Sequence, residues 1–139
     1  MIFDTHAHYD DRKFDADREE LIEQLRVSGI GRVVDIGADI DSTRRAVALA
    51  KQYDFIYAAA GVHPSDVDCL DERSFQWLTC LVEESVEEQG KIIAVGEIGL
   101  DYYWEKDPEQ REKQKYWFEK QMELARKTGL PGVIHFREA

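Results

Sequence analysis

The sequence opens with MIFDTHAH (residues 1–8), in which a short apolar run leads into two histidines. One residue separates His6 from His8, and side chains alternate between the two faces of an extended chain, so both imidazoles are expected on the same side. Such a pair can bind one metal ion. A catalytic divalent metal usually takes three or more protein ligands and keeps a position open for water. Further ligands are therefore expected from other strands.

Strand-like and helix-like segments alternate along the rest of the sequence. Apolar runs predict five strands, at residues 2–4, 32–37, 55–60, 92–96 and 130–135. Amphipathic spacing predicts four helices between them, at residues 17–27, 41–53, 71–88 and 107–128. We expect Asp41 or Ser42 to supply the N-capping oxygen of the second helix. Asp107 is the expected N-cap of the fourth, with Pro108 at the first helical position and Gln110 completing a capping box.

Helices of this length between strands imply parallel strands joined by right-handed crossovers. The expected fold is α/β: a TIM-type (β/α)₈ barrel of which this sequence supplies the first five strands and four helices. An open doubly wound sheet is the alternative. Residues 1–139 are expected to form a single, partial barrel domain, since a chain of 139 residues suits one core.

The composition limits the possible partners. The formal net charge is -11 and no Lys/Arg cluster stands out, which argues against tight, sequence-independent binding of nucleic acid through a basic surface. A metal ion could supply local positive charge for a phosphodiester. No apolar run reaches the roughly 18 residues that span a bilayer. The sequence also lacks the basic and apolar regions of a signal peptide. With two isolated cysteines, Cys69 and Cys80, we expect a cytoplasmic protein with no membrane partner.

Five candidate ligands follow predicted strands. His6 and His8 follow the first strand, His63 the third, Glu97 the fourth and His135 the fifth. Because parallel strands end at one edge of the sheet, these side chains are expected to converge there. Each residue alone has an ordinary explanation, as a loop residue, a salt-bridge partner or a hydrogen-bonded core histidine. Together they predict a divalent metal centre.

Four stretches resemble the successive signatures of the TatD-type metal-dependent deoxyribonucleases of the amidohydrolase-like barrel group. They are DTHAH (4–8), GVHP (61–64), GEIGLDYY (96–103) and LPGVIHFREA (130–139). The resemblance implies that His6 and His8 bind one metal, that Glu97 bridges two metals and that His135 binds the second. It places His63 on the substrate side.

The resemblance also has limits. Phe136 stands where the family usually has a small polar residue, and Gly132 where a larger apolar residue is usual, so substrate fit is expected to differ. A complete barrel of this family has about 250 residues. A further metal-binding histidine and a late-strand aspartate of the family have no counterpart in this sequence.

The expected reaction is hydrolysis of phosphodiester bonds of DNA by a water molecule that two divalent ions (Mg, Mn or Zn) activate. Glu97 and His63 are the expected catalytic residues, with His63 bonding a phosphate oxygen or the leaving group. Asp101, Arg137 and Tyr102 are expected to support a ligand or to contact substrate. Asp101 could instead cap the loop. The aromatics at positions 102–104 could stack on bases of single-stranded DNA or pack beneath their loop.

Two other functions stay open. A half barrel with unpaired edge strands could be a non-catalytic fragment that forms homo-oligomers and keeps a vestigial metal site. An amidohydrolase-type enzyme acting on C–N or lactone bonds could use the same ligands, although GEIGLDYY argues against it.

Overall fold

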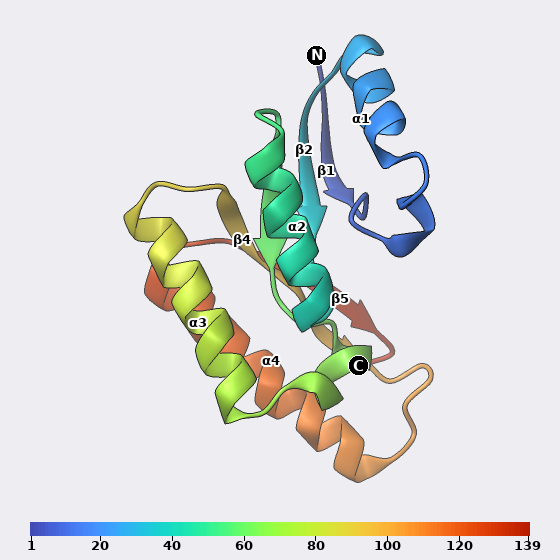
Figure 1. Cartoon of the computed structure of the whole chain (residues 1–139). Helices are drawn as coiled ribbons and strands as arrows, with labels where there is room; N and C mark the ends of the chain where they lie inside the picture. The colour runs from blue at the N-terminus through green and yellow to red at the C-terminus, as the bar shows by residue number, and fades with distance from the viewer.

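The computed structural model describes residues 1–139, which form one five-stranded sheet with helices packed against it (Figure 1). Neighbouring strands are all parallel, and their order in the sheet is their order in the sequence. They are β1 (Ile2–Ala7), β2 (Ile30–Ile36), β3 (Ile56–Ala60), β4 (Ile92–Asp101) and β5 (Gly132–Arg137). A doubly wound sheet reverses its strand order at a switch point, whereas a barrel wall does not. The predicted barrel-type α/β sheet is confirmed, and the doubly wound alternative is wrong.

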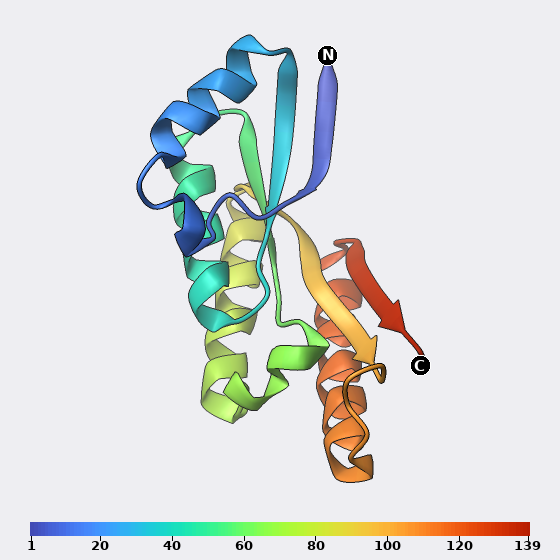
Figure 2. The same cartoon turned by 90° about the vertical axis from the view of Figure 1, so that its right-hand side faces the viewer.

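Four helices connect the strands near their predicted positions: α1 (Arg18–Val27), α2 (Ile40–Gln52), α3 (Glu72–Glu87) and α4 (Pro108–Thr128). Two short 3₁₀ helices have no counterpart in the sequence prediction: η1 (Arg12–Phe14) and η2 (Pro64–Cys69). In Figure 2, α1 and α2 lie beside the β2 and β3 part of the sheet, while α4 runs beside β4. No helix combines the length and the apolar composition that crossing a membrane requires.

The start of α2 differs from the prediction. Its N-cap is Asp39 rather than Asp41 or Ser42. The Asp39 carboxylate accepts a hydrogen bond from the Ser42 amide at 2.7 Å, and the Asp39 amide donates to Ser42 Oγ at 2.9 Å. This reciprocal capping box satisfies two amides at the helix start. Asp41 lies in the first turn and pairs with Arg12 instead.

The start of α4 follows the prediction in part. Asp107 is the N-cap, Pro108 is the first helical residue, and the Asp107 carboxylate accepts from the Glu109 amide at 3.2 Å. The prediction that Gln110 completes a capping box is wrong. The side-chain amide of Gln110 donates instead to Asp68 Oδ1 of η2, at 3.0 Å. Gln110 therefore contributes to the contact between α4 and η2 and not to the N-cap of its own helix.

Three strands continue beyond their predicted ends. His6, Glu97 and His135 consequently lie within β1, β4 and β5, not after them, whereas His8 and His63 do follow strands. The physical reason is that backbone pairing of β4 with β5 continues, with His135 opposite Gly99 and Arg137 opposite Asp101. The site residues on these strands are therefore held by the sheet ladder and not by loops.

The two faces of the sheet are packed differently. On the outer face, strand residues such as Val33, Ile56 and Ile98 pack with helix residues in the main core: Ile22, Leu78, Val82 and Leu124. On the inner face, a small cluster unites Ile36, Ala59 and Ala94, with Val133 against it. His135 lies two residues after Val133 and thus shares the inner face. Glu97 lies at a register shift in β4, just before Ile98. The candidate ligands gather on the inner face.

Candidate metal centre

Glu97 lies between histidines on two sides. His6 Nε2 is 3.3 Å from Glu97 Oε2, and His135 Nδ1 is 3.3 Å from Glu97 Oε1. One ligand atom from each of His6, His8 and Glu97 lies within 4.8 Å of the others, and the same holds for His63, Glu97 and His135. The structure therefore brings all five predicted residues into two groups that share one carboxylate.

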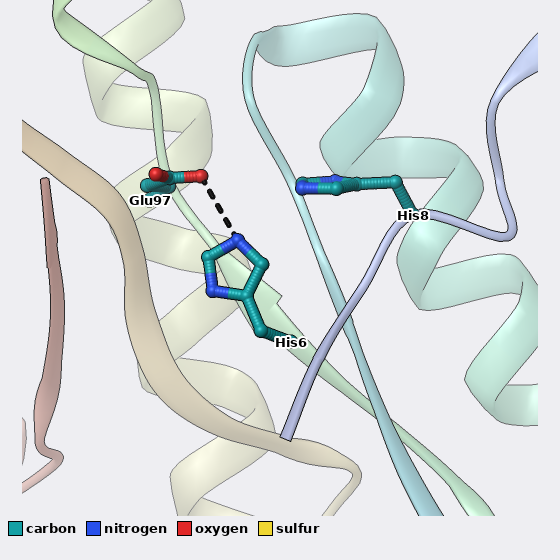
Figure 3. Close-up of side chains that lie close together, drawn as sticks. All are labelled: His6, His8 and Glu97. Carbon is teal, nitrogen blue, oxygen red and sulfur yellow. Dashed lines mark ion pairs between the residues drawn. The ribbon is translucent and has the colours of Figure 1, made fainter. Parts of the chain in front are cut away.

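The two histidines of the first group, His6 and His8, lie at the end of β1 and just after it. The rings of His6 and His8 lie 5.1 Å apart and nearly perpendicular, and Figure 3 shows both beside Glu97. His8 Nδ1 lies 2.9 Å from the carbonyl oxygen of Ile36. Because a carbonyl can only accept, Nδ1 carries the proton and Nε2 keeps its lone pair. A carbonyl acceptor on the second nitrogen is the usual way to orient a metal-binding histidine.

His135 has a defined orientation in the second group. Its Nε2 lies 3.0 Å from Asp101 Oδ2, while its Nδ1 faces Glu97. An ionised Asp101 only accepts, so Nε2 carries a proton, and in a neutral ring Nδ1 is the nitrogen with the lone pair. The available ligand atom of His135 is therefore Nδ1.

The donor set fits a divalent cation. With the proton of His135 on Nε2, the Nδ1 lone pair and the Glu97 carboxylate are two acceptors that face each other at 3.3 Å. Two acceptors repel each other, so the contact is favourable only with a cation between them, either a proton on Nδ1 or a metal ion. The Glu97 side chain is only 13% exposed, so water screens the repulsion poorly. Imidazole nitrogen together with carboxylate oxygen is a donor set typical of Zn, Mn or Fe.

Asp101 stays ionised although it is buried. Burial would raise the pKa of Asp101, but hydrogen bonds from Arg137, His135 and the Tyr103 amide lower it to about 2. Arg137 Nη2 donates to Asp101 Oδ2 at 2.9 Å, and the Tyr103 amide donates to Oδ1 at 3.1 Å. Asp101 thus makes both contacts considered from the sequence: it supports an imidazole and it caps the following loop.

His63 accepts a hydrogen bond on Nδ1, which distinguishes it from His8 and His135. Its Nδ1 accepts a hydrogen bond from the Ser65 amide at 3.1 Å, at the start of η2. A neutral imidazole then carries its proton on Nε2. Burial lowers the pKa of His63, which keeps the ring neutral near pH 7. Its ring lies 4.5 Å from that of His135. His63 consequently offers a hydrogen-bond donor to this site rather than a free lone pair.

The remaining predicted residues, Arg137 and Tyr102, lie outside the two groups of candidate ligands. The Arg137 guanidinium bonds Asp101 and lies 4.9 Å from the centre of the Tyr103 ring. The Arg111 guanidinium lies 4.5 Å from the centre of the Tyr102 ring, and the Tyr102 hydroxyl is buried without a hydrogen-bond partner. Of the three aromatics at positions 102–104, the exposed ones are Tyr103 and Trp104.

Two buried glutamines of α4 have structural roles at the site that sequence reasoning missed. Gln121 accepts from the amide of Val62 at 2.8 Å and donates to its carbonyl at 3.2 Å, next to His63. Gln114 makes the same pair of bonds to Asp101, at 2.9 and 3.1 Å. The two glutamines are seven residues apart, on the buried face of α4 that includes Trp117. Amides at that spacing within an apolar helix face were the available signal.

A second missed feature is the buried carboxyl pair of Asp10 and Asp35, which are 4% and 0% exposed. The Tyr9 amide donates to Asp35 Oδ1 at 2.5 Å. One oxygen of each carboxyl group, Asp10 Oδ1 and Asp35 Oδ2, is buried without a hydrogen-bond partner. Burial and the contact with Asp10 raise the pKa of Asp35 to about 9. The bond from the Tyr9 amide to Asp35 holds the chain after His8 against β2.

Comparison with known proteins identifies the family to which this chain is similar. The family model described as TatD related DNase matches residues 3–139. The "Uncharacterized metal-dependent hydrolase YabD" of Bacillus subtilis is 42% identical over 139 residues, which are 100% of this chain and 52% of that protein. The "3'-5' ssDNA/RNA exonuclease TatD" of Cronobacter sakazakii is 30% identical over 99% of this chain and 50% of its own length.

Solved structures give the same result for the fold. The crystal structure of the TatD homologue YjjV from Escherichia coli superposes with a TM-score of 0.82 at 31% identity, over 99% of this chain and 51% of that one. The predicted partial barrel is confirmed, and this chain spans about half the length of the relatives it matches.

Proposed function

This chain belongs to the TatD-related DNase family, and on that premise we propose that it acts as a metal-dependent hydrolase on phosphodiester bonds of single-stranded nucleic acid. The observation that carries the proposal is the position of Glu97, with His6 and His135 each 3.3 Å from a different carboxylate oxygen. The names of the Bacillus relative, a metal-dependent hydrolase, and the Cronobacter relative, an exonuclease, support the reaction class.

We propose two divalent ions. His6, His8 and Glu97 would hold one ion, and Glu97 with His135 would hold the other, so that the single carboxylate is shared. When bound, such ions polarise phosphoryl oxygens and lower the pKa of water. Zn and Mn suit these nitrogen and oxygen donors, and Mg would require more water ligands.

The chain's own residues would orient the substrate. The neutral His63 ring, with its proton on Nε2, would donate a hydrogen bond to a non-bridging phosphate oxygen or to the leaving group. Its position depends on Gln121, which holds the Val62 backbone beside it. Asp101 would keep the Nδ1 lone pair of His135 directed at the shared carboxylate. Each contact stabilises one arrangement of the site before substrate arrives, which is the main contribution of a protein to such catalysis.

Hydrolysis of a labelled single-stranded DNA by the purified chain tests the proposal. We expect cleavage that requires added divalent metal and disappears in Glu97→Ala. Glu87→Ala, which removes an exposed glutamate of α3, is the matched control and should cleave like the wild type. Cleavage without metal, or cleavage that persists in Glu97→Ala, would overturn the proposal. Hydrolysis of a simple amide or lactone instead of DNA would favour the amidohydrolase alternative.

One observation favours the second candidate function, a self-associating barrel segment that retains metal without turnover. The edge strands expose large apolar side chains: Ile2 and Phe3 on β1 are 56% and 60% exposed, and Ile134 and Phe136 on β5 are 41% and 60% exposed. Unpaired edges with apolar side chains favour association. A molar mass of a dimer or larger, together with metal binding and no cleavage, would support this candidate. A monomer that cleaves DNA would exclude it.

A further inference from the structure

Two large aromatic side chains stand exposed just after β4. Tyr103 is 42% exposed and Trp104 is 74% exposed. Their ring centres are 4.5 Å apart and the rings are nearly perpendicular, so each supports the other without being covered. Neither ring is part of the metal centre, and Trp104, the more exposed of the two, leaves most of its surface open to a ligand.

A short series of contacts connects this aromatic pair to the metal centre. The Arg137 guanidinium lies over the Tyr103 ring and donates to Asp101, which in turn holds His135. The Tyr103 amide also bonds the Asp101 carboxylate, at 3.1 Å. Because these contacts fix the start of the loop to a residue that supports a candidate ligand, the aromatic pair lies beside the site.

Three cationic side chains lie around the same loop in a chain of net charge -11, and one of them, Arg137, is paired with Asp101. Lys106 Nζ and Arg111 Nη2 both donate to the Tyr102 carbonyl, each at 3.2 Å, and the Arg137 guanidinium lies 4.9 Å from the centre of the Tyr103 ring. The two carboxylates of the loop are turned to backbone amides: Glu105 accepts from the amide of residue 107 and Asp107 caps α4. Exposed aromatic rings with cations beside them are the combination that single-stranded nucleic acids require.

We propose that Tyr103 and Trp104 form a stacking subsite for an unpaired base, on the strand whose phosphodiester occupies the metal centre. This subsite rests on the proposed function and adds a substrate requirement to it. Stacking is tolerant of base identity but needs a base that is free of its complement. The site would therefore favour single strands over duplexes, and strands with bases over a bare sugar-phosphate backbone.

Binding to two labelled oligonucleotides of equal length tests the subsite. One is oligo(dT), and the other has the same backbone with abasic residues in place of the bases. Fluorescence anisotropy in excess chelator measures affinity without cleavage. We expect the wild type to prefer oligo(dT), and we expect Trp104→Ala to lose about tenfold in oligo(dT) affinity. Affinity for the abasic strand should change little, because the substitution removes only a contact to a base.

Two variants keep the result unambiguous. Trp104→Phe retains a ring and should recover most of the affinity for oligo(dT). Tyr116→Ala removes another exposed aromatic, on α4 and 49% exposed, and should bind like the wild type. The subsite is overturned if the wild type does not distinguish the two strands, if it binds neither, or if Trp104→Ala weakens both equally. Metal-dependent hydrolysis of bis(4-nitrophenyl) phosphate, which has no base, tests the proposed function separately.

Discussion

His135 and Asp101, on neighbouring strands, are joined by a contact of 3.0 Å between Nε2 and Oδ2. The contact leaves the other imidazole nitrogen, Nδ1, directed at Glu97. Since the partner of one ring nitrogen decides which nitrogen can bind metal, Asp101 determines the ligand atom of the second group. This relationship gives the first prediction.

Asp101→Ala should weaken metal binding about 10- to 100-fold, because His135 loses the acceptor that orients it. The variant should also lose about 1–3 kcal/mol in free energy of unfolding, since Arg137 and His135 are left without their partner. Calorimetric titration with Mn²⁺ and urea denaturation in chelator measure the two effects. Asp71→Ala is the control: it removes the α3 cap that accepts from Ser74, costs about 1 kcal/mol and should leave metal affinity unchanged. Unaltered metal affinity in Asp101→Ala would contradict the assigned role.

His63 and His135 should respond differently to the same substitution. His63→Ala should slow phosphodiester hydrolysis by about 100-fold, as expected for loss of a positioned donor, while metal affinity changes little. His135→Ala should lower metal affinity itself. Titration with Mn²⁺ and hydrolysis of single-stranded DNA by both variants separate the roles. If His63→Ala loses metal as severely as His135→Ala, then Nε2 of His63 is a ligand and its assignment as a donor is wrong.

Gln121→Leu should destabilise the fold although the two side chains have similar volume. Gln121 is 1% exposed, and its loss leaves the amide and carbonyl of Val62 buried without partners. We expect a loss of roughly 2–4 kcal/mol from two unsatisfied groups. Gln110→Leu, the same change at a position of α4 that is not buried, should stay within about 0.5 kcal/mol. Equal stability of the two variants in urea denaturation would contradict this role of Gln121.

The Asp10–Asp35 pair predicts an unusual dependence of stability on pH. The pKa of Asp35 is raised from 3.8 to about 9 in the folded protein. Between these values the folded chain retains a proton that the unfolded chain releases, so the stabilising contribution of Asp35 falls as pH rises. Asp35→Asn carries no titrating proton at this position. The Tm of the wild type minus that of Asp35→Asn, measured in chelator, should decrease from about pH 5 to about pH 8.5. A difference that is constant or that increases with pH would contradict the raised pKa of Asp35.

Much of the fold could be predicted because the local signals are strong. Apolar runs and helical periodicity located every strand and every α-helix, though not the two 3₁₀ helices. Parallel strands necessarily bring His63 and His135 to one edge. The start of α2 could not be predicted, since Asp39 and Asp41 both offer a capping oxygen and only the position of Ser42 decides between them. Strand ends depend on pairing with the neighbouring strand, which local sequence does not contain.

The supporting residues of the site were harder to predict than its ligands. Asp35 lies in an apolar strand, and nothing in the sequence near it identifies Asp10 as its partner. Gln114 and Gln121 bond backbone groups of residues 101 and 62, at sequence distances of 13 and 59. Such contacts arise from tertiary packing, so periodicity could indicate buried amides but not the groups they bind.

Titration of the metal-free chain with Mn²⁺ tests the central claim most directly, because it asks whether one carboxylate serves both histidine groups. The wild type should bind two ions per chain, as a shared-carboxylate site requires. Glu97→Gln should lose both binding steps, and His8→Ala should lose one. Saturable binding by Glu97→Gln equal to that of the wild type, or no saturable binding by the wild type, would contradict a metal centre built around Glu97.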